Sequence, residues 1–274
     1  MALIDVHCHL DAPAYQELAT VCRQSQQAGV NTIVAVGTGR TSNEHILSLQ
    51  QSHPGQIWAA LGLHPERLDT SWQELEAVVD QVQVYRSRIV ALGEIGLPHY
   101  ALRERRMAQE QAQQREAFLQ ALVQAAVRFD LPVALHAPHD AALLALDIVK
   151  RYQPPGALFH WHKSPPDVTT AICEAGYFIS VTPEVCYRER DQHLVQMVPL
   201  SNLLLESDGP WSYAGEFAGQ PTTPALVVRV AEEVARLKGI SLAEVQEVTT
   251  ANARRLFGQT GDEKIGSRTV RPAV

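Results

Sequence analysis

The feature that most constrains the fold of this chain is a regular alternation of short apolar runs with longer segments of helical periodicity. The apolar runs are rich in Val, Ile and Leu, and such an alternation predicts βαβ units whose strands are parallel. Eight units of this kind are present. We expect their strands at residues 4–9, 32–37, 57–64, 89–96, 132–136, 157–162, 177–181 and 203–208.

Helical periodicity fills the segments between these strands. We expect helices at residues 14–28, 42–52, 72–85, 103–129, 140–152, 167–175 and 189–197, and two more after the last strand at 224–237 and 242–257. Segment 103–129 has the clearest amphipathic pattern. Ser241 is suited to start the last helix, because its hydroxyl can accept a hydrogen bond from a free backbone N–H.

The number and order of these elements predict a single-domain TIM-like (β/α)8 barrel of the α/β class. The chain has 274 residues, and such a barrel needs roughly 250. Length alone would also accommodate two smaller domains, but the sequence contains no internal repeat, low-complexity tract or linker. We therefore assign residues 1–257 to the barrel and the polar residues 258–274 to a flexible C-terminal tail.

Composition and charge narrow the classes of function. Apolar residues make up 46% of the chain and charged residues 19%, which is typical of an enzyme with a packed core. The net charge of −7 gives no general attraction to nucleic acid or to an anionic membrane. The four cysteines lack the spacing of a zinc knuckle or a disulfide scaffold, and neither a signal peptide nor a membrane span is evident. We expect a cytoplasmic protein.

The first expected strand ends in a His-x-His motif formed by His7 and His9. Side chains alternate between the two faces of a strand, so both imidazoles point the same way and Cys8 points the other way. The motif alone is weak, because 11 histidines in this chain give about 0.4 such pairs by chance. Two histidines satisfied by ordinary hydrogen bonds would explain it equally well.

Further polar side chains stand at the ends of other apolar strands. Glu94 lies in such a run, where an unpaired carboxylate would cost several kcal/mol, so either a cation or an arginine in a core salt bridge must accompany it. His136, His160 and Asp208 each end a strand in the same way. Taken singly, each could be a capping or hydrogen-bonding residue.

Taken together, these residues predict a metal site. They follow strands 1, 4, 5, 6 and 8, and the carboxyl ends of the strands form the face that carries the active site in such barrels. Imidazole and carboxylate without thiolate suit zinc, manganese, iron or magnesium. Six ligands are too many for one tetrahedral zinc with an open position, which favours two divalent ions bridged by a carboxylate, with Glu94 as the candidate. The predicted ligands are His7, His9, Glu94, His136, His160 and Asp208.

The chain also resembles the TatD family of metal-dependent deoxyribonucleases and hydrolases, which have amidohydrolase-like barrels. The matching stretches are residues 5–11, 62–65, 93–97, 135–137, 158–160, 205–210 and 249–257. The resemblance implies that one ion is held by His7, His9, Glu94 and Asp208, and the other by Glu94, His136 and His160. It places His64 near the site, hydrogen-bonded to substrate or to a ligand, although this residue could merely cap the third helix.

Departures from the family pattern affect the substrate more than the metals. Pro138 stands where the family commonly has Arg, and residues 215–221 replace a basic segment after Asp208. Two phosphate-binding cations are therefore missing, and DNA becomes a doubtful partner. His162 and Lys163 are expected to compensate in part as substrate contacts.

These observations predict a metal-dependent hydrolase that cleaves phosphoester bonds with a metal-activated water, with deoxyribonuclease activity as one form. Asp208 and Glu94 are the expected catalytic residues, Asp208 orienting or deprotonating the water. An amide, ester or lactone hydrolase with the same two-metal site is the alternative. A metal-containing binding protein without turnover is the third hypothesis.

Overall fold

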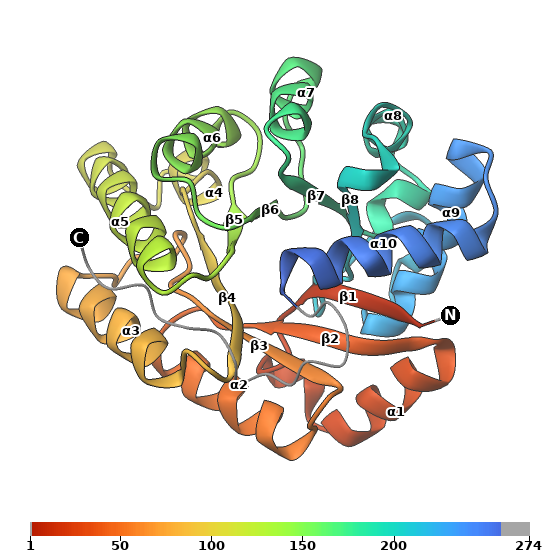
Figure 1. The fold of residues 1–274 in the computed structure, drawn as a ribbon, viewed down its shortest axis with the longest axis horizontal. Helices are drawn as coiled ribbons and strands as arrows, with labels where there is room; N and C mark the ends of the chain where they lie inside the picture. Colours follow the sequence, from red (N-terminus) through yellow and green to blue (C-terminus); the bar gives the residue numbers. More distant parts are fainter. Residues whose placement is uncertain (1, 259–274) are drawn as a thin grey trace.

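Eight parallel strands in the order β1 to β8 form a single sheet in the computed structural model, which describes residues 2–258. Helices surround the sheet on its outer side (Figure 1). Two backbone hydrogen bonds bring its edges together: His9 N donates to Gly209 O at 2.8 Å and Asp208 N donates to His7 O at 3.0 Å. The strands are Leu3–Cys8, Val30–Val36, Ile57–Leu61, Ile89–Gly96, Val133–His136, Ala157–Phe159, Phe178–Val181 and Leu203–Leu205.

The predicted TIM-like barrel is therefore confirmed, with shorter strands at several carboxyl ends. β3, β6 and β8 stop before residues 62–64, 160–162 and 206–208. Trp161 and Asp208 have φ angles of 39° and 44°, and this left-handed backbone cannot continue a strand. The strands thus end where the polar side chains begin.

Most helices agree with the predicted segments. α3 (Trp72–Tyr85) and α8 (Glu189–Met197) have the predicted ends, and Ser241 caps α10, accepting from Glu244 N at 3.2 Å. The first helix begins later than predicted, because Pro13–Tyr15 form a short 3-10 helix ahead of it. The others are α1 (Leu18–Ala28), α2 (Arg40–Ser52), α4 (Tyr100–Arg103), α5 (Gln109–Arg128), α6 (Ala141–Tyr152), α7 (Pro166–Glu174), α9 (Val227–Lys238) and α10 (Leu242–Leu256).

The prediction of one helix over residues 103–129 is wrong. The chain turns between α4 and α5, where Arg105 has a left-handed φ of 56°. Buried Met107 donates its backbone N–H back to Ala101 O at 3.1 Å, which closes the turn. The Gln111 side chain then accepts from Ala108 N at 2.9 Å, so α5 starts with its own cap. The turn places Arg103 and the residues after it beside the carboxyl end of the barrel.

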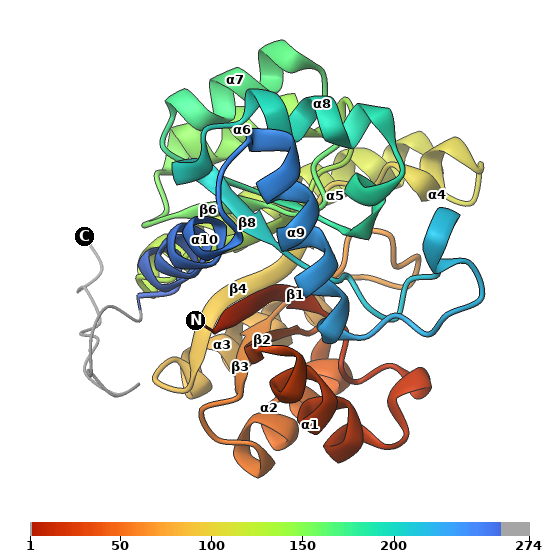
Figure 2. The same cartoon turned by 90° about the vertical axis from the view of Figure 1, so that its right-hand side faces the viewer.

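Side-chain alternation divides the core into two layers. On β2, Ile33 and Ala35 pack toward the helices, whereas Val34 and Val36 pack inside the barrel. Phe257 joins the inner layer, with its ring centroid 6.2 Å from that of Trp58. α10 therefore lies beside the start of β1 (Figure 2), where Thr250 Oγ1 donates to Ala2 O at 2.8 Å. The interior is filled at this end, which leaves the carboxyl ends of the strands for the site.

None of the helices formed by residues 2–258 has the length and apolar character that a membrane crossing requires. The predicted tail, residues 258–274, lies outside the described residues except for Gly258. The assignment of residues 1–257 to one domain stays a prediction, as does the cytoplasmic location.

Candidate metal centre

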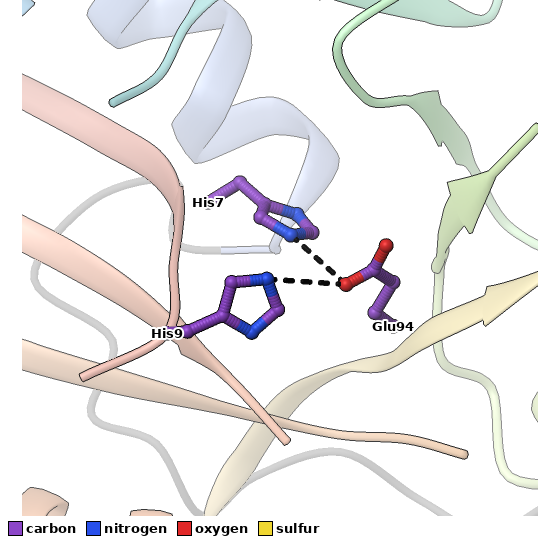
Figure 3. Close-up of side chains that lie close together, drawn as sticks. All are labelled: His7, His9 and Glu94. Atoms are coloured by element: carbon purple, nitrogen blue, oxygen red, sulfur yellow. Dashed lines mark hydrogen bonds and ion pairs between the residues drawn. The ribbon is translucent and has the colours of Figure 1, made fainter. Parts of the chain in front are cut away.

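Glu94 lies at the centre of the predicted site, near the end of β4, and is 1% exposed. Its Oε2 atom is 3.2 Å from His7 Nε2 and 3.5 Å from His9 Nε2 (Figure 3). Both rings come from β1 and the residue that follows it, as the alternation of side chains predicts. The two predicted imidazoles therefore share one carboxylate oxygen.

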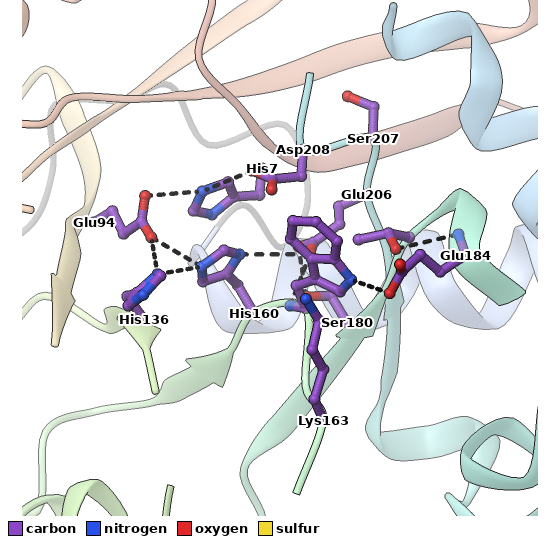
Figure 4. A network of polar contacts seen from close by, with 12 residues as sticks. His7, Glu94, His136, His160, Lys163, Ser180, Glu184, Glu206, Ser207 and Asp208 are labelled. Carbon is purple, nitrogen blue, oxygen red and sulfur yellow. Dashed lines mark hydrogen bonds and ion pairs between the residues drawn. The ribbon is translucent and has the colours of Figure 1, made fainter. Parts of the chain in front are cut away.

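The other oxygen of Glu94 has a separate set of neighbours. Oε1 is 2.8 Å from His136 Nδ1, 2.8 Å from His160 Nε2 and 3.3 Å from His64 Nε2. His136 ends β5 and His160 follows β6, so adjacent strands supply these two rings. Figure 4 shows His7 directed at one oxygen of Glu94, and His136 and His160 directed at the other.

Asp208 completes the first group. Its Oδ1 atom is 3.6 Å from His7 Nε2 and 3.5 Å from His9 Nε2. The structure thus brings all six predicted ligands together. The four histidines are divided between the two oxygens of Glu94, and Asp208 lies beside the first pair.

The carboxylates of this cluster stabilise positive charge on the groups around them. Although burial lowers it, the hydrogen bond to Asp208 and the charge of Glu94 raise the pKa of His9 to about 9. Burial likewise opposes the raised pKa of His160, which the charges of Glu94 and Glu206 hold well above its usual value. Glu94 itself has a pKa well below normal, against the effect of burial, because of the nearby charges of His64, His160 and His7. The carboxylate is therefore ionised and draws protons onto its neighbours.

Divalent cations fit this arrangement. Within the described residues, the buried Oδ1 of Asp208 has only the long contacts to His7 and His9, at 3.6 and 3.5 Å, and makes no shorter hydrogen bond. An ionised oxygen in that position costs free energy unless a cation meets it. The rings of His7 and His160 are stacked with centroids 3.9 Å apart, a spacing unfavourable for two protonated imidazoles. Neutral imidazoles are the ligand form, so cations would supply the positive charge in place of protons.

Glu206, which the sequence analysis did not select, supports His160. It is fully buried, and its Oε1 atom is 3.5 Å from His160 Nδ1. It accepts hydrogen bonds from Trp161 N at 2.7 Å and Ser180 Oγ at 2.5 Å, which fix its position. A carboxylate beside the far nitrogen of a ligand histidine orients the ring and increases its basicity. The only signal in the sequence was an acidic residue directly after three leucines.

Glu66 plays the corresponding part for His136. Its Oε1 atom is 3.3 Å from His136 Nε2, so the other nitrogen, Nδ1, faces Glu94. The carboxylate accepts backbone N–H groups from His99, Tyr100 and Ala101 at 2.7 to 2.8 Å. Burial opposes the change, but the hydrogen bonds from His136 and these amides lower the pKa of Glu66 to about 2.

Asp5 ties β1 to the segment that carries Asp208. This fully buried side chain accepts Ser207 N at 3.0 Å, Ser207 Oγ at 2.5 Å and His7 N at 3.2 Å. Burial raises the pKa of Asp5 to about 8, against the effect of the Ser207 hydrogen bonds. These contacts set His7 and Asp208 in register across the closure of the barrel.

The tautomer of His64 distinguishes this residue from the others. Its Nδ1 accepts a hydrogen bond from Glu66 N at 3.2 Å, so the proton of the neutral ring lies on Nε2. A protonated nitrogen donates a hydrogen bond and does not bind a metal ion. His64 therefore acts as a donor toward Glu94 or a substrate. It does not cap the third helix, because the side chain of Ser71 caps α3.

The structure does not place His162 where the sequence analysis expected it. The residue is 1% exposed, its Nε2 is 2.9 Å from Thr169 Oγ1, and it is absent from the lining of the cavity that contains Glu94. His162 follows Trp161 on the opposite side of the chain, so it points toward α7. We leave it out of the proposed substrate contacts.

Cys8 points away from the two histidines, as predicted. Its Sγ atom is 3.7 Å from Tyr15 Oη and 3.6 Å from Gly209 O, in the layer between sheet and helices.

A cavity of about 990 Å³ opens above Glu94 and Asp208. Its lining contains five cationic side chains, which come from the segments that follow β4, β6 and β7: Arg103, Arg106, Lys163, Arg188 and Arg190. The absence of arginine and lysine at the two family positions therefore does not leave the site without cations. Lys163, which was expected to compensate in part, lines the cavity together with four arginines.

Neighbouring carboxylates neutralise part of this charge. Arg106 pairs with Glu104 at 2.7 Å, and Arg188 and Arg190 pair with Glu184 at 2.5 and 2.8 Å. Among residues 2–258, no carboxylate lies within ion-pair distance of Arg103 or Lys163.

The chain matches the family described as TatD related DNase over residues 4–258. The chain belongs to the TatD family. A Haemophilus influenzae relative, named an uncharacterized metal-dependent hydrolase, is 30% identical over 256 residues that cover 93% of this chain and 99% of the relative. Human deoxyribonuclease TATDN3 is 30% identical over 265 residues, covering 94% of this chain and 95% of that protein.

Solved TatD structures have the same fold. The crystal structure of YjjV, a TatD homologue from Escherichia coli, superposes with a TM-score of 0.84 at 26% identity and covers 93% of this chain and 98% of that one. The chain belongs to this family and matches relatives that are named metal-dependent hydrolases or deoxyribonucleases over nearly their full length. The protein is therefore a metal-dependent hydrolase.

Proposed function

We propose that the protein hydrolyses phosphoester bonds of nucleic acid with two divalent ions that share Glu94. One ion would be held by His7, His9, Asp208 and Glu94 Oε2. The other would be held by His136, His160 and Glu94 Oε1. The name of the human relative, a deoxyribonuclease, supports this class of substrate.

The observation that carries the proposal is the division of nitrogens between the two oxygens of Glu94, with contacts of 3.2 and 3.5 Å at Oε2 and of 2.8 Å at Oε1. A single bound ion would not need both sets. When bound, such ions polarise a phosphoryl oxygen and activate a water molecule as the nucleophile.

Asp208 is suited to direct the attacking water. Although burial would raise it, the hydrogen bond from His9 and the charges of His7 and His160 hold the pKa of Asp208 below its usual value. Its carboxylate is ionised at neutral pH and can accept a hydrogen bond or a proton from the water. Among residues 2–258, the only contacts of Oδ1 are those to His7 and His9, at 3.6 and 3.5 Å.

The substrate phosphate would be bound by hydrogen-bond donors that face the cavity. His64 presents its Nε2 proton to the oxygens at the centre, and Lys163 lines the same cavity with a positive charge. These groups would bind the non-bridging oxygens of the phosphate and stabilise the charge that develops there.

The charge of the cavity favours a phosphoester over a neutral amide, ester or lactone. A neutral substrate gains little from Arg103 and Lys163, neither of which is paired with a carboxylate in the described part of the chain, whereas a phosphodiester carries the complementary charge. The ligand set contains imidazole and carboxylate without thiolate, so zinc, manganese, iron and magnesium remain the candidate ions.

The test is a screen of the metal-loaded protein against bis-p-nitrophenyl phosphate, a DNA oligonucleotide, and panels of esters, lactones and amides. We expect turnover of the phosphodiester and the oligonucleotide, and its loss in Asp208→Ala. Asp147→Ala, an exposed aspartate on α6, serves as the control and should retain activity. Turnover restricted to esters or amides would support the alternative, and binding without turnover of any panel would support a non-catalytic protein.

A further inference from the structure

Trp211 is an exposed indole inside the catalytic cavity. It lies three residues after Asp208, is 56% exposed and lines the cavity that contains Glu94. Its backbone is fixed, because Trp211 N donates to Asp208 O at 3.0 Å and Thr222 Oγ1 donates to Trp211 O at 2.5 Å. The backbone that carries the indole is thus held beside Asp208.

No other large exposed apolar side chain in the described residues lines this cavity. Trp72, at 45% exposure, is a useful contrast because its ring packs edge-on against Phe118 on the outer side of the barrel. An indole buries a large apolar area when it meets a partner, and aromatic rings are favourable partners for it. Leaving Trp211 in water at the mouth of an active site is therefore typical of a contact surface for a ligand.

The surroundings of Trp211 define what it can bind. The indole of Trp161 meets it edge-on, with ring centroids 5.2 Å apart, and Glu184 accepts the Trp161 Nε1 proton at 3.1 Å. Lys163 Nζ lies 3.3 Å from the ring centroid of Trp161 and 3.2 Å from Tyr100 Oη. The ammonium group of Lys163 thus lies beside the rings of Trp161 and Tyr100, and the hydrogen bond to Glu184 fixes the ring of Trp161.

We propose that Trp211 is a specificity-determining residue, whose indole stacks on a planar aromatic ring of the substrate while Lys163 binds the adjoining phosphate. This inference rests on the proposed hydrolysis of phosphoesters and adds a requirement for a ring next to the phosphate. A ring stacked on Trp211 would be held close to Asp208, because the two residues share a backbone hydrogen bond. The site would then prefer nucleotide units to phosphodiesters with small alkyl groups.

The test compares two phosphodiesters that share their sugar and phosphate groups, the dinucleotide thymidylyl-(3′→5′)-thymidine and its analogue in which hydrogen replaces both bases. We expect the wild-type protein to prefer the substrate with bases in kcat/KM, and Trp211→Ala to reduce this ratio at least about fivefold, the lower end of measured base stacking. Most of the change should appear in KM. Trp211→Phe, which keeps a ring, should recover most of the preference, and Trp72→Ala should keep the wild-type ratio.

An unchanged ratio in Trp211→Ala would overturn the inference, even if both substrates are hydrolysed. If neither substrate is hydrolysed, the proposed function fails and binding decides the inference separately. In that case we compare the dissociation constants of thymidine 5′-monophosphate and deoxyribose 5-phosphate for the metal-loaded protein. The inference requires at least about fivefold tighter binding of the nucleotide, lost in Trp211→Ala, and equal affinities would contradict it.

Discussion

The salt dependence of nucleic-acid binding follows from the cations that line the cavity. Of the five, Arg106, Arg188 and Arg190 already pair with carboxylates, which leaves Arg103 and Lys163 to meet phosphates directly. Each phosphate neutralised on a single strand contributes about −0.7 to the slope of log affinity against log salt. Two contacts give a slope of about −1.4, and all five would give about −3.5.

The assay measures the affinity of a single-stranded oligonucleotide between 50 and 200 mM salt, in an Asp208→Ala background of confirmed metal content that does not cut the strand. A slope of −1.4 corresponds to a loss of affinity of about sevenfold over this range. Arg103→Gln with Lys163→Gln should remove most of the slope. Arg128→Gln is the control. This exposed arginine ends α5 near the amino end of β5, and it does not line the cavity.

Two results would show that the phosphates are not bound by Arg103 and Lys163 alone. If the double variant kept the wild-type slope, the phosphates would be bound by cations outside the cavity. A wild-type slope of −3.5 or steeper would mean that Arg106, Arg188 and Arg190 exchange their carboxylate partners for phosphates.

Three further predictions follow from individual contacts. Glu206→Gln should weaken metal binding by about 10- to 100-fold, because Glu206 supports His160; a metal titration with Glu174→Gln as control checks this, and wild-type affinity would contradict it. Burial lowers the pKa of Lys163 to about 8, so its positive charge is largely present at pH 7 and lost above pH 8. The KM of a phosphodiester should therefore rise between pH 7 and 9; Lys163→Arg, which stays charged, should abolish the rise, and the same rise in that variant would argue against Lys163. Cys8→Ala should keep its metal content and activity, because Sγ faces the outer layer; metal loss from the folded variant would be incompatible with that orientation.

The sequence was sufficient for the barrel because strand and helix periods are local signals. Polar residues that interrupt apolar runs marked the strand ends, so Glu94, His136 and His160 could be selected before their contacts were known. The His-x-His motif added the first strand through side-chain alternation alone.

Features that depend on distant parts of the chain could not be predicted in this way. Glu66 lies in a loop, and its contact with His136 joins residues 70 positions apart. Glu206 gains its role only when β6 and β7 bring Trp161 and Ser180 around it. The turn at Arg105 was missed because helical periodicity continues across it, although the backbone does not.

The arginines that line the cavity could not be predicted from the sequence either. Arg188 precedes a helix and Arg103 ends one, and neither position signals that the side chain faces the site. The sequence showed that two cations are absent from the family positions. The arginines that replace them could be identified only from the folded barrel.

Anomalous diffraction from crystals loaded with manganese can show whether Glu94 bridges two divalent ions. We expect two peaks per chain, one beside His7, His9, Asp208 and Glu94 Oε2, the other beside His136, His160 and Glu94 Oε1. A matched crystal of Glu94→Gln should lose at least one of them. A single peak in the wild-type protein, or two peaks of which neither contacts Glu94, would show that Glu94 does not bridge two ions.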